Sequence, residues 1–343
     1  MRAVYIEGFG GPEVLRFGER PTPEPGPGEV RVRLLAAALN HLDVWVRRGV
    51  ANPRLTFPHI LGADGAGVVD AVGPGVSEAW QGQAVVLNPG VSCMRCEACL
   101  AGRDNLCPEY GILGEHQDGT YAEYVVVPEV NLVKKPANLS FEEAASFPLT
   151  FLTAWQMVVD KLRVQPGETL LVMAAASGVG VAAIQIAKLF GARVIAAAGS
   201  EAKLARARAL GADATVNYRE PGWHKRVRAL TEGKGVDAVA DSTGKAFWEG
   251  VIKATKNGGR ISLVGATSGY EAVTPLAHVF FRQLAIYGST MAPKARLFKI
   301  ARFFESGAFK PVVDRVLPLE EAAKAQRILE ERQASGKVVL KIG

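Results

Sequence analysis

One pattern repeats along the second half of the chain and limits its possible folds more than any other feature: a short apolar run is followed by an amphipathic stretch. The apolar runs predict buried strands at 169–173, 193–197, 214–217, 236–240 and 260–264. The intervening stretches predict helices at 179–190, 201–210, 222–231 and 246–254. Strands that are apolar throughout and alternate with helices form a parallel sheet covered on both faces. We therefore expect an α/β fold with a doubly wound domain.

The first 150 residues have a different pattern, typical of a β-rich domain. Short strands are predicted at 30–35, 65–72 and 84–87, after a stiff connection, PTPEPGPGE. Beyond about residue 300 the chain returns to short mixed elements and ends in a strand at 336–342. We expect residues 1–152 and 296–343 to form the β-rich domain, with residues 153–295 inserted as the doubly wound domain.

Composition excludes several classes of function. The formal net charge is +6, but the basic residues are dispersed, and the densest group, 224–228, has the spacing of a solvated helix face. No nucleic-acid-binding motif accompanies the charge, so no nucleic-acid partner is expected, and the excess favours an anionic cofactor instead. A charged, strand-like start and the lack of a long apolar run predict neither a signal peptide nor a membrane span, and hence a cytoplasmic protein.

All the cysteines of the chain lie in one run, CMRCEACLAGRDNLC. They are Cys93, Cys96, Cys99 and Cys107. This spacing can place four sulfurs around one tetrahedral Zn²⁺, and four thiolates leave no position for a substrate, which indicates a structural zinc lobe at 90–108. The alternative is four unrelated thiols or a redox pair.

A phosphate-binding loop is predicted where the first strand of the doubly wound domain meets its helix. The segment AAASGVG at 174–180 is a degenerate form of the glycine-rich dinucleotide fingerprint, with Ala175, Ser177 and Gly180 at its three key positions. Small residues allow the backbone to approach a pyrophosphate, which the helix N-terminus attracts. We expect Ser177, Gly178, Val179 and Gly180 to bind the cofactor.

The end of the second strand favours NADP(H) over NAD(H). An NAD site usually has a carboxylate there, whereas this strand leads into Gly199 and Ser200, and Glu201 follows only at the helix start. Ser200, Lys203 and Tyr218 are candidates for binding a 2′-phosphate, although Lys203 can also be an ordinary solvated residue. Further cofactor contacts are expected at the carboxyl ends of later strands, from Thr243, Val264, Gly265 and Ala266.

The motifs together resemble the medium-chain dehydrogenase/reductase superfamily, which contains zinc alcohol dehydrogenases and quinone oxidoreductases. The resemblance covers nearly the whole chain. It rests on PGPGEVRVR, NHLDVWVRRG, HILGADGAGVV, the four-cysteine lobe, DGTYAEYVVVP, FPLTFLTAW, AAASGVGVAAIQIAKLFGA and GKVVLKIG. It implies a GroES-like catalytic domain and a Rossmann cofactor domain, commonly assembled as dimers or tetramers, here through the late-strand segment His278–Ser289.

Zinc alcohol dehydrogenases bind a second, catalytic zinc, and the resemblance shows which residues replace its ligands here. Asn40, Ala63 and Leu149 stand where that family has a Cys, a His and a Cys. Leu42 replaces the hydroxyl residue of the proton relay, while Asp64 keeps the neighbouring acidic position. This sequence therefore departs from the pattern of a zinc-assisted alcohol oxidation, which needs a Lewis acid at the alkoxide.

The segment N-x-x-D, formed by Asn40 and Asp43, resembles the quinone oxidoreductase branch, whose members work without a catalytic metal. The resemblance implies hydride transfer from NADPH to a quinone or an α,β-unsaturated carbonyl. The catalytic candidates are Asn40, His41, Asp43 and Trp45, with Asn88, Pro89 and Asp64 as weaker ones and Thr153 expected at the nicotinamide. Two other functions remain open: a zinc-type alcohol dehydrogenase, and a non-catalytic NADPH-binding protein.

Overall fold

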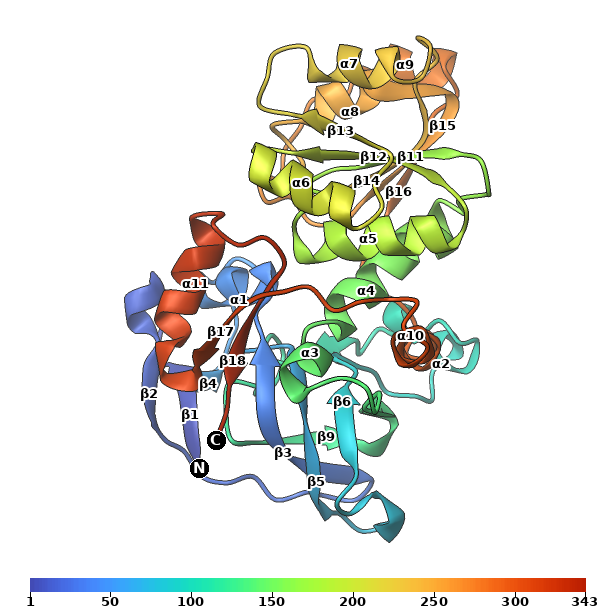
Figure 1. Ribbon diagram of the computed structural model, residues 1–343. Helices are drawn as coiled ribbons and strands as arrows, with labels where there is room; N and C mark the ends of the chain where they lie inside the picture. The colour runs from blue at the N-terminus through green and yellow to red at the C-terminus, as the bar shows by residue number, and fades with distance from the viewer. The chain divides into compact units, whose positions relative to one another are not determined.

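The computed structural model describes residues 1–343, and its contacts divide the chain into two compact units. The first, here called the β-rich unit, comprises residues 1–149 and 293–343, and the second, the parallel-sheet unit, comprises residues 150–292. The chain crosses between the units twice, and both crossings lie slightly earlier in the sequence than expected. Figure 1 shows the parallel-sheet unit in green to orange.

The β-rich unit is built around a seven-stranded sheet in the order β10-β6-β5-β3-β18-β17, with β9 pairing with β3. Its strands are β3 (Glu29–Ala38), β5 (Asp64–Val72), β6 (Ala84–Leu87), β9 (Tyr124–Pro128), β10 (Leu132–Lys134), β17 (Val313–Pro318) and β18 (Lys337–Lys341). A three-stranded sheet joins β1 (Arg2–Ile6), β2 (Arg16–Glu19) and β4 (His59–Ile60), and β7 (Gly90–Val91) pairs with β8 (Gly111–Ile112).

Short helices connect and cover these strands. They are η1 (Pro12–Val14), α1 (His41–Arg47), η2 (Glu78–Trp80), α2 (Glu97–Leu100), η3 (Asp104–Leu106), η4 (Glu129–Asn131), α3 (Phe141–Ala145), α10 (Ala295–Glu305), η6 (Leu319–Glu321) and α11 (Ala322–Glu330). The alternating side chains of β3 are buried on one face, where Val30, Val32 and Leu34 join a continuous apolar core. The C-terminal strand β18 is part of this core, because it pairs with β3 and β17.

The parallel-sheet unit has six strands in the order β13-β12-β11-β14-β15-β16, and all of them run parallel. They are β11 (Thr169–Val172), β12 (Arg193–Ala198), β13 (Ala214–Asn217), β14 (Val236–Asp241), β15 (Thr255–Leu263) and β16 (Ala285–Gly288). This is the strand order of a dinucleotide-binding fold, in which ligands bind at the carboxyl ends of β11 and β14, where the strand order reverses.

Helices lie on both faces of this sheet (Figure 1). They are α5 (Gly178–Leu189), α6 (Glu201–Ala209), α7 (Trp223–Ala229), α8 (Trp248–Ala254) and α9 (Leu276–Phe281), and α4 (Pro148–Trp155) continues into the π-helical turn η5 (Gln156–Lys161). Every residue of β11 is buried, which explains its unbroken apolar sequence. The α/β class and the two domain types expected from the sequence are confirmed. No helix of the structure has the length and apolarity needed to cross a membrane.

Candidate active site

The β-rich unit brings together the three chain positions at which zinc alcohol dehydrogenases carry metal ligands. Asn40 lies between β3 and α1, Asp64 begins β5 next to Ala63, and Leu149 lies in α4. The Asn40 side-chain amide donates to Asp64 Oδ2 at 2.9 Å, and the Leu149 backbone N–H donates to Asp64 Oδ1 at 2.8 Å. The methyl group of Ala63 and the alkyl side chain of Leu149 offer no atom that can bind a metal.

A residue that the sequence analysis did not single out, Lys337, completes this group. Its Nζ donates to Asn40 Oδ1 at 2.7 Å and to Asp64 Oδ2 at 3.0 Å. Lys337 is 5% exposed, Asn40 6% and Asp64 0%. The carbonyl oxygen of the Asn40 amide is thus occupied by an ammonium group, and its nitrogen is occupied by a carboxylate. Asn40 is fixed in one orientation by these two contacts.

Asp43 belongs to a second buried group immediately behind the first. Its Oδ2 accepts from the Asn40 backbone N–H at 2.8 Å, which caps the first turn of α1, and from the Tyr121 hydroxyl at 2.7 Å. Asp43 is 1% exposed, and burial raises the pKa of its carboxyl to about 6. The hydrogen bonds to Asn40 and Tyr121 oppose this rise but do not cancel it. In this arrangement Asp43 holds Asn40 in place from inside the protein.

The other predicted site residues of the β-rich unit lie at or near its loops. His41 begins α1, is partly exposed, and contacts the ring of Trp45 edge to face at 5.0 Å between centroids. Burial lowers the pKa of His41 below its usual value. Asn88 is buried and accepts from the Gly90 backbone N–H at 3.0 Å, while the Pro89 carbonyl accepts from Leu113, so this pair leads into the cysteine lobe.

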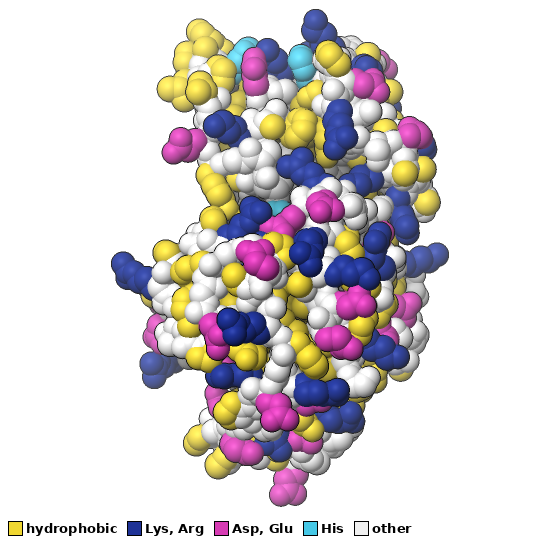
Figure 2. Space-filling view, turned by 90° about the vertical axis from the view of Figure 1, so that its left-hand side faces the viewer, with side chains coloured by type: hydrophobic (Ala, Val, Ile, Leu, Met, Phe, Trp, Pro, Cys, Tyr) yellow, Lys and Arg dark blue, Asp and Glu magenta, His cyan; other side chains and the backbone are white.

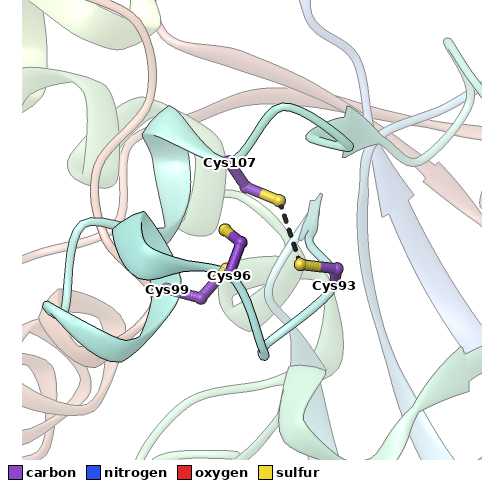
Figure 3. A group of neighbouring side chains, drawn as sticks. All are labelled: Cys93, Cys96, Cys99 and Cys107. Atoms are coloured by element: carbon purple, nitrogen blue, oxygen red, sulfur yellow. Dashed lines mark hydrogen bonds between the residues drawn. The ribbon is translucent and has the colours of Figure 1, made fainter.

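The four cysteines lie together in the segment that contains α2 and η3 (Figure 3). Their sulfur atoms all lie within 4.8 Å of one another, and those of Cys93 and Cys107 are 3.5 Å apart. Sulfurs bound to one tetrahedral Zn²⁺ are about 3.8 Å apart, given Zn–S distances of about 2.3 Å. A hydrogen bond from the Arg95 backbone N–H lowers the pKa of Cys93 to about 6, whereas burial raises the pKa of Cys99 to about 12. The positions of the four sulfurs, rather than these opposite pKa shifts, fit a tetrathiolate zinc site.

Lys294 joins this lobe to the second crossing of the chain between the units. Its backbone N–H donates to Asp104 Oδ1 at 3.0 Å, and its Nζ donates to the Gly90 carbonyl and to Ser92 Oγ. Lys294 and Asp104 are each 5% exposed. The cysteine lobe thus binds Lys294 through residues from both of its ends. Lys294 follows Pro293, the residue at which the chain re-enters the β-rich unit.

The predicted phosphate loop lies between β11 and α5 in the parallel-sheet unit. Ser177 caps α5, because its Oγ accepts from the Gly180 backbone N–H at 3.1 Å. The N–H groups of Gly178 and Val179 are in the first turn of the helix and have no helical partner, as an anion-binding helix start requires. A Cβ at Gly180 would lie 2.4 Å from the Ala174 carbonyl oxygen, so only glycine fits there.

The end of β12 carries the candidates for binding the ribose of the cofactor. Ser200 occupies the N-cap position of α6 without a side-chain capping hydrogen bond, and Glu201 forms an ion pair with Arg208 on the same helix. A Cβ at Gly199 would lie 3.2 Å from the Tyr218 ring and 2.9 Å from Arg219 Nε. The structure therefore adds Arg219 to the candidates for binding a 2′-phosphate, which were Ser200, Lys203 and Tyr218. Its position directly after Tyr218 is the signal that could have identified it from the sequence.

Thr243, Val264, Gly265 and Ala266 follow the ends of β14 and β15, as expected from the strand pattern. Thr243 is buried, and its hydroxyl and N–H both bind Asp241 Oδ1, at 2.5 and 2.7 Å. Val264, Gly265 and Ala266 are at least partly exposed. Thr153 is buried in α4, and its hydroxyl lies 3.9 Å from the sulfur of Met291.

A dinucleotide-binding sheet, joined to a β-rich unit with a tetracysteine cluster and a buried polar centre, defines a nicotinamide-dependent oxidoreductase of two domains. Residues 26–137 match the family of alcohol dehydrogenase GroES-like domains, and residues 178–306 match the zinc-binding dehydrogenase family. The chain belongs to the medium-chain dehydrogenase/reductase superfamily and is an oxidoreductase of the alcohol dehydrogenase or quinone reductase type.

Relatives of both types are similar to this chain over its full length. A NAD-dependent alcohol dehydrogenase of Sulfurisphaera tokodaii and a quinone oxidoreductase of Pseudomonas aeruginosa are each 32% identical, with 99% of both chains covered in each case. A crystal structure of a NAD-dependent alcohol dehydrogenase is 70% identical, with a TM-score of 0.98 and all of both chains covered. A crotonyl-CoA carboxylase/reductase in complex with NADP is 26% identical, with a TM-score of 0.91 over 100% of this chain and 95% of that chain.

Proposed function

We propose that the protein is an NADP(H)-dependent reductase that transfers a hydride to a quinone or an α,β-unsaturated carbonyl without a catalytic metal. The observation that carries this proposal is the centre formed by Asn40, Asp64 and Lys337. The position that holds zinc in alcohol dehydrogenases offers an amide, a methyl group and an alkyl chain as ligands, and the one carboxylate beside it is paired with an ammonium group. A single carboxylate, already neutralised, is not a zinc ligand set.

The residues of the chain have separable functions in such a reaction. Bound NADPH supplies the hydride, which carries two electrons to the acceptor carbon, and the acceptor oxygen becomes negative until it receives a proton. The N-terminus of α5 binds the pyrophosphate and so fixes the position of the cofactor. The Asn40 centre supplies a fixed polar environment near the oxygen that becomes negative, and its orientation is set before the substrate binds.

We assign the zinc of this protein a structural function. Cys93, Cys96, Cys99 and Cys107 would hold one ion and fill its coordination shell. A zinc ion bound there stabilises the lobe and cannot bind substrate. The expected stoichiometry is one zinc per chain.

The preference for NADP(H) rests on the charges at the end of β12. The strand end itself carries no carboxylate for the 2′-hydroxyl of NAD, and Glu201, which follows it at the start of α6, pairs with Arg208. The side chains of Tyr218 and Arg219 lie beside Gly199 at this strand end, and Lys203 follows in α6; such a basic group suits a 2′-phosphate. Since several relatives are described as NAD-dependent, the two cofactors need a direct comparison.

The second candidate function is alcohol oxidation, which is favoured by the 70% identity to a protein described as a NAD-dependent alcohol dehydrogenase. The deciding experiment measures the zinc content of the purified protein and its turnover with NADPH and NADH on quinones, enones and aldehydes, and with NADP⁺ and NAD⁺ on simple alcohols. We expect one zinc per chain and the fastest turnover on a quinone or enone with NADPH. Two zinc ions per chain together with zinc-dependent oxidation of ethanol or benzyl alcohol would show that the proposal is wrong.

A further inference from the structure

Lys337 combines three features that are rarely found in one lysine. It is almost completely buried, it contacts residues 297 and 273 positions away in the chain, and both of these residues lie where a catalytic metal is held in zinc alcohol dehydrogenases. It begins β18, whereas Asn40 precedes α1 and Asp64 begins β5. Residues from three separate parts of the chain thus meet, and the Lys337 ammonium group contacts both Asn40 and Asp64.

Stability alone gives little reason for such an arrangement. Burying two opposite charges costs several kcal/mol of desolvation per ion, and apolar residues of similar size often stabilise a fold as well or better. The ammonium group has three N–H bonds, of which two are directed at Asn40 Oδ1 and Asp64 Oδ2. The structure gives the third no protein acceptor. One of the three N–H bonds of Lys337 is therefore not used by the fold.

We propose that Lys337 provides the positive charge of this centre. It fixes the Asn40 amide in one orientation, and its charge stabilises the negative charge that develops on the acceptor oxygen when the hydride arrives. Lys337 thus takes over the electrostatic function that a metal ion has in zinc alcohol dehydrogenases, and because of its burial it acts as a positioning residue. This inference rests on the proposed metal-free hydride transfer and names the residue that makes it effective.

Four variants and one control separate this function from a purely structural ion pair. Lys337→Met and Asp64→Asn each leave one buried charge without its partner, so both should unfold more easily than the parent protein. The double variant Lys337→Met/Asp64→Asn contains neither charge. Lys337→Arg keeps the positive charge at the same place. Lys341→Met, an exposed lysine on the same strand, is the matched control.

The measurements are the thermal midpoint, kcat and KM for the reaction that the parent enzyme catalyses fastest, and the zinc content. We expect the double variant to recover most of the stability lost in the single variants, but to keep a kcat about 10²-fold below the parent, with KM changed much less. Lys337→Arg should restore kcat to within about tenfold of the parent. Lys341→Met should match the parent, and zinc content should remain one per chain throughout.

Recovery of both stability and kcat in the double variant would overturn the inference, because Lys337 would then serve only to neutralise Asp64. The same conclusion follows if Lys337→Arg is as slow as Lys337→Met while it folds normally. If the parent oxidises alcohols and reduces no quinone or enone, the proposed function is wrong, but the inference about Lys337 is still decided. The same variants are then compared in alcohol oxidation, where the alkoxide oxygen carries the negative charge.

Discussion

The buried carboxyl group of Asp43, which lies next to Asn40, should make the stability of the fold depend on pH. This group receives hydrogen bonds from the Asn40 backbone and from Tyr121, and burial raises its pKa to about 6. The fold therefore prefers the protonated form of Asp43 more strongly than the unfolded chain does. The stabilising effect is complete below the unfolded pKa of about 4 and is lost as the pH rises through about 6.

The first prediction concerns Asp43→Asn, which keeps an oxygen to accept both hydrogen bonds but cannot ionise. Between pH 3 and pH 7 the free energy of unfolding of the parent should fall by about 3 kcal/mol relative to that of this variant, since one pKa unit corresponds to about 1.4 kcal/mol. Denaturant unfolding at several pH values measures this difference. Parallel curves for the two proteins would mean that Asp43 ionises as readily in the folded chain as in the unfolded one.

The second prediction tests the residues at the end of β12. Arg219→Ala and Lys203→Ala should each weaken NADPH binding by about 1–2 kcal/mol, the loss expected for one charge-assisted hydrogen bond, and leave NADH binding nearly unchanged. Arg206→Ala removes an exposed charge from the middle of α6 and is the control. Titrations followed by cofactor fluorescence give the two affinities. Equal losses for NADPH and NADH would argue against a 2′-phosphate contact.

Sequence reasoning could predict which residues lie together where they belong to one short motif. The cysteines and Ser177 belong to short motifs, so their neighbours in the chain are also their neighbours in space. Lys337 was missed because it lies in an apolar C-terminal strand and contacts Asn40 only through the fold, 297 positions away. Arg219 was missed because its approach to Gly199 depends on how β12 and β13 are paired.

At the level of elements, α5 and its preceding loop depend on one glycine. The backbone of Gly180 packs so closely on the loop that a Cβ would lie 2.4 Å from Ala174 O and 2.7 Å from Ala175 Cα. These are backbone atoms, which cannot move aside without shifting the loop. The same loop presents the N–H groups that suit a pyrophosphate, so packing and cofactor binding share this constraint.

The third prediction is that Gly180→Ala destabilises the parallel-sheet unit by about 1–3 kcal/mol through overpacking and weakens NADPH and NADH binding to a similar extent. Gly8→Ala is the control, because a Cβ there meets nothing within 4 Å. Thermal unfolding and cofactor titration measure both effects. Normal cofactor binding in a destabilised Gly180→Ala variant would separate the packing function of the loop from its phosphate-binding function.

The fourth prediction concerns the cysteine lobe. Cys96→Ser should lower zinc content and loosen residues 90–107, because the lobe contains only short elements and depends on its metal ligands. Amide hydrogen exchange in this segment should become roughly tenfold faster or more. Arg95→Ala, an exposed neighbour in the same lobe, should leave exchange unchanged. Unchanged exchange in a zinc-free Cys96→Ser protein would show that the lobe folds without metal.

The strands of the parallel sheet were the most predictable elements, because buried strands are apolar along their whole length. The prediction for β13 agrees with the structure at both ends. β15, in contrast, begins at Thr255 but was expected only from residue 260. Its early residues, Lys256–Gly259, are polar or glycine and so do not form the apolar run by which buried strands were predicted. Pairing with β14 extends this strand, and such pairing cannot be read from a local pattern.

At the scale of the whole molecule, one edge of the parallel sheet is open. β16 is its last strand, and the preceding segment has several exposed apolar side chains, namely Tyr270, Val273, Leu276, Phe280 and Phe281. Figure 2 shows hydrophobic side chains on the surface of this unit. An open edge beside apolar side chains invites pairing with a second copy across a two-fold axis. We propose that the protein is a homodimer or a larger assembly built on this edge.

The fifth prediction is a sedimentation mass at micromolar protein of at least twice the 36.5 kDa of one chain. Replacing Phe280 and Phe281 with Ser should reduce the assembly to monomers while the fold is kept, because both side chains are exposed in the single chain. Replacing the exposed Leu100 with Ser, on the cysteine lobe, is the control. A monomeric parent protein would exclude the proposed dimer.

The attachment of Lys294 to the cysteine lobe has a mechanical consequence. Each of the two peptide crossings is fastened within the β-rich unit: the Leu149 backbone binds Asp64, and Lys294 binds Asp104, Gly90 and Ser92. The first crossing is held by the polar centre and the second by the cysteine lobe. If zinc holds that lobe together, its loss would also loosen the segment around Lys294, although Lys294 lies far from the cysteines in the sequence and is not a metal ligand.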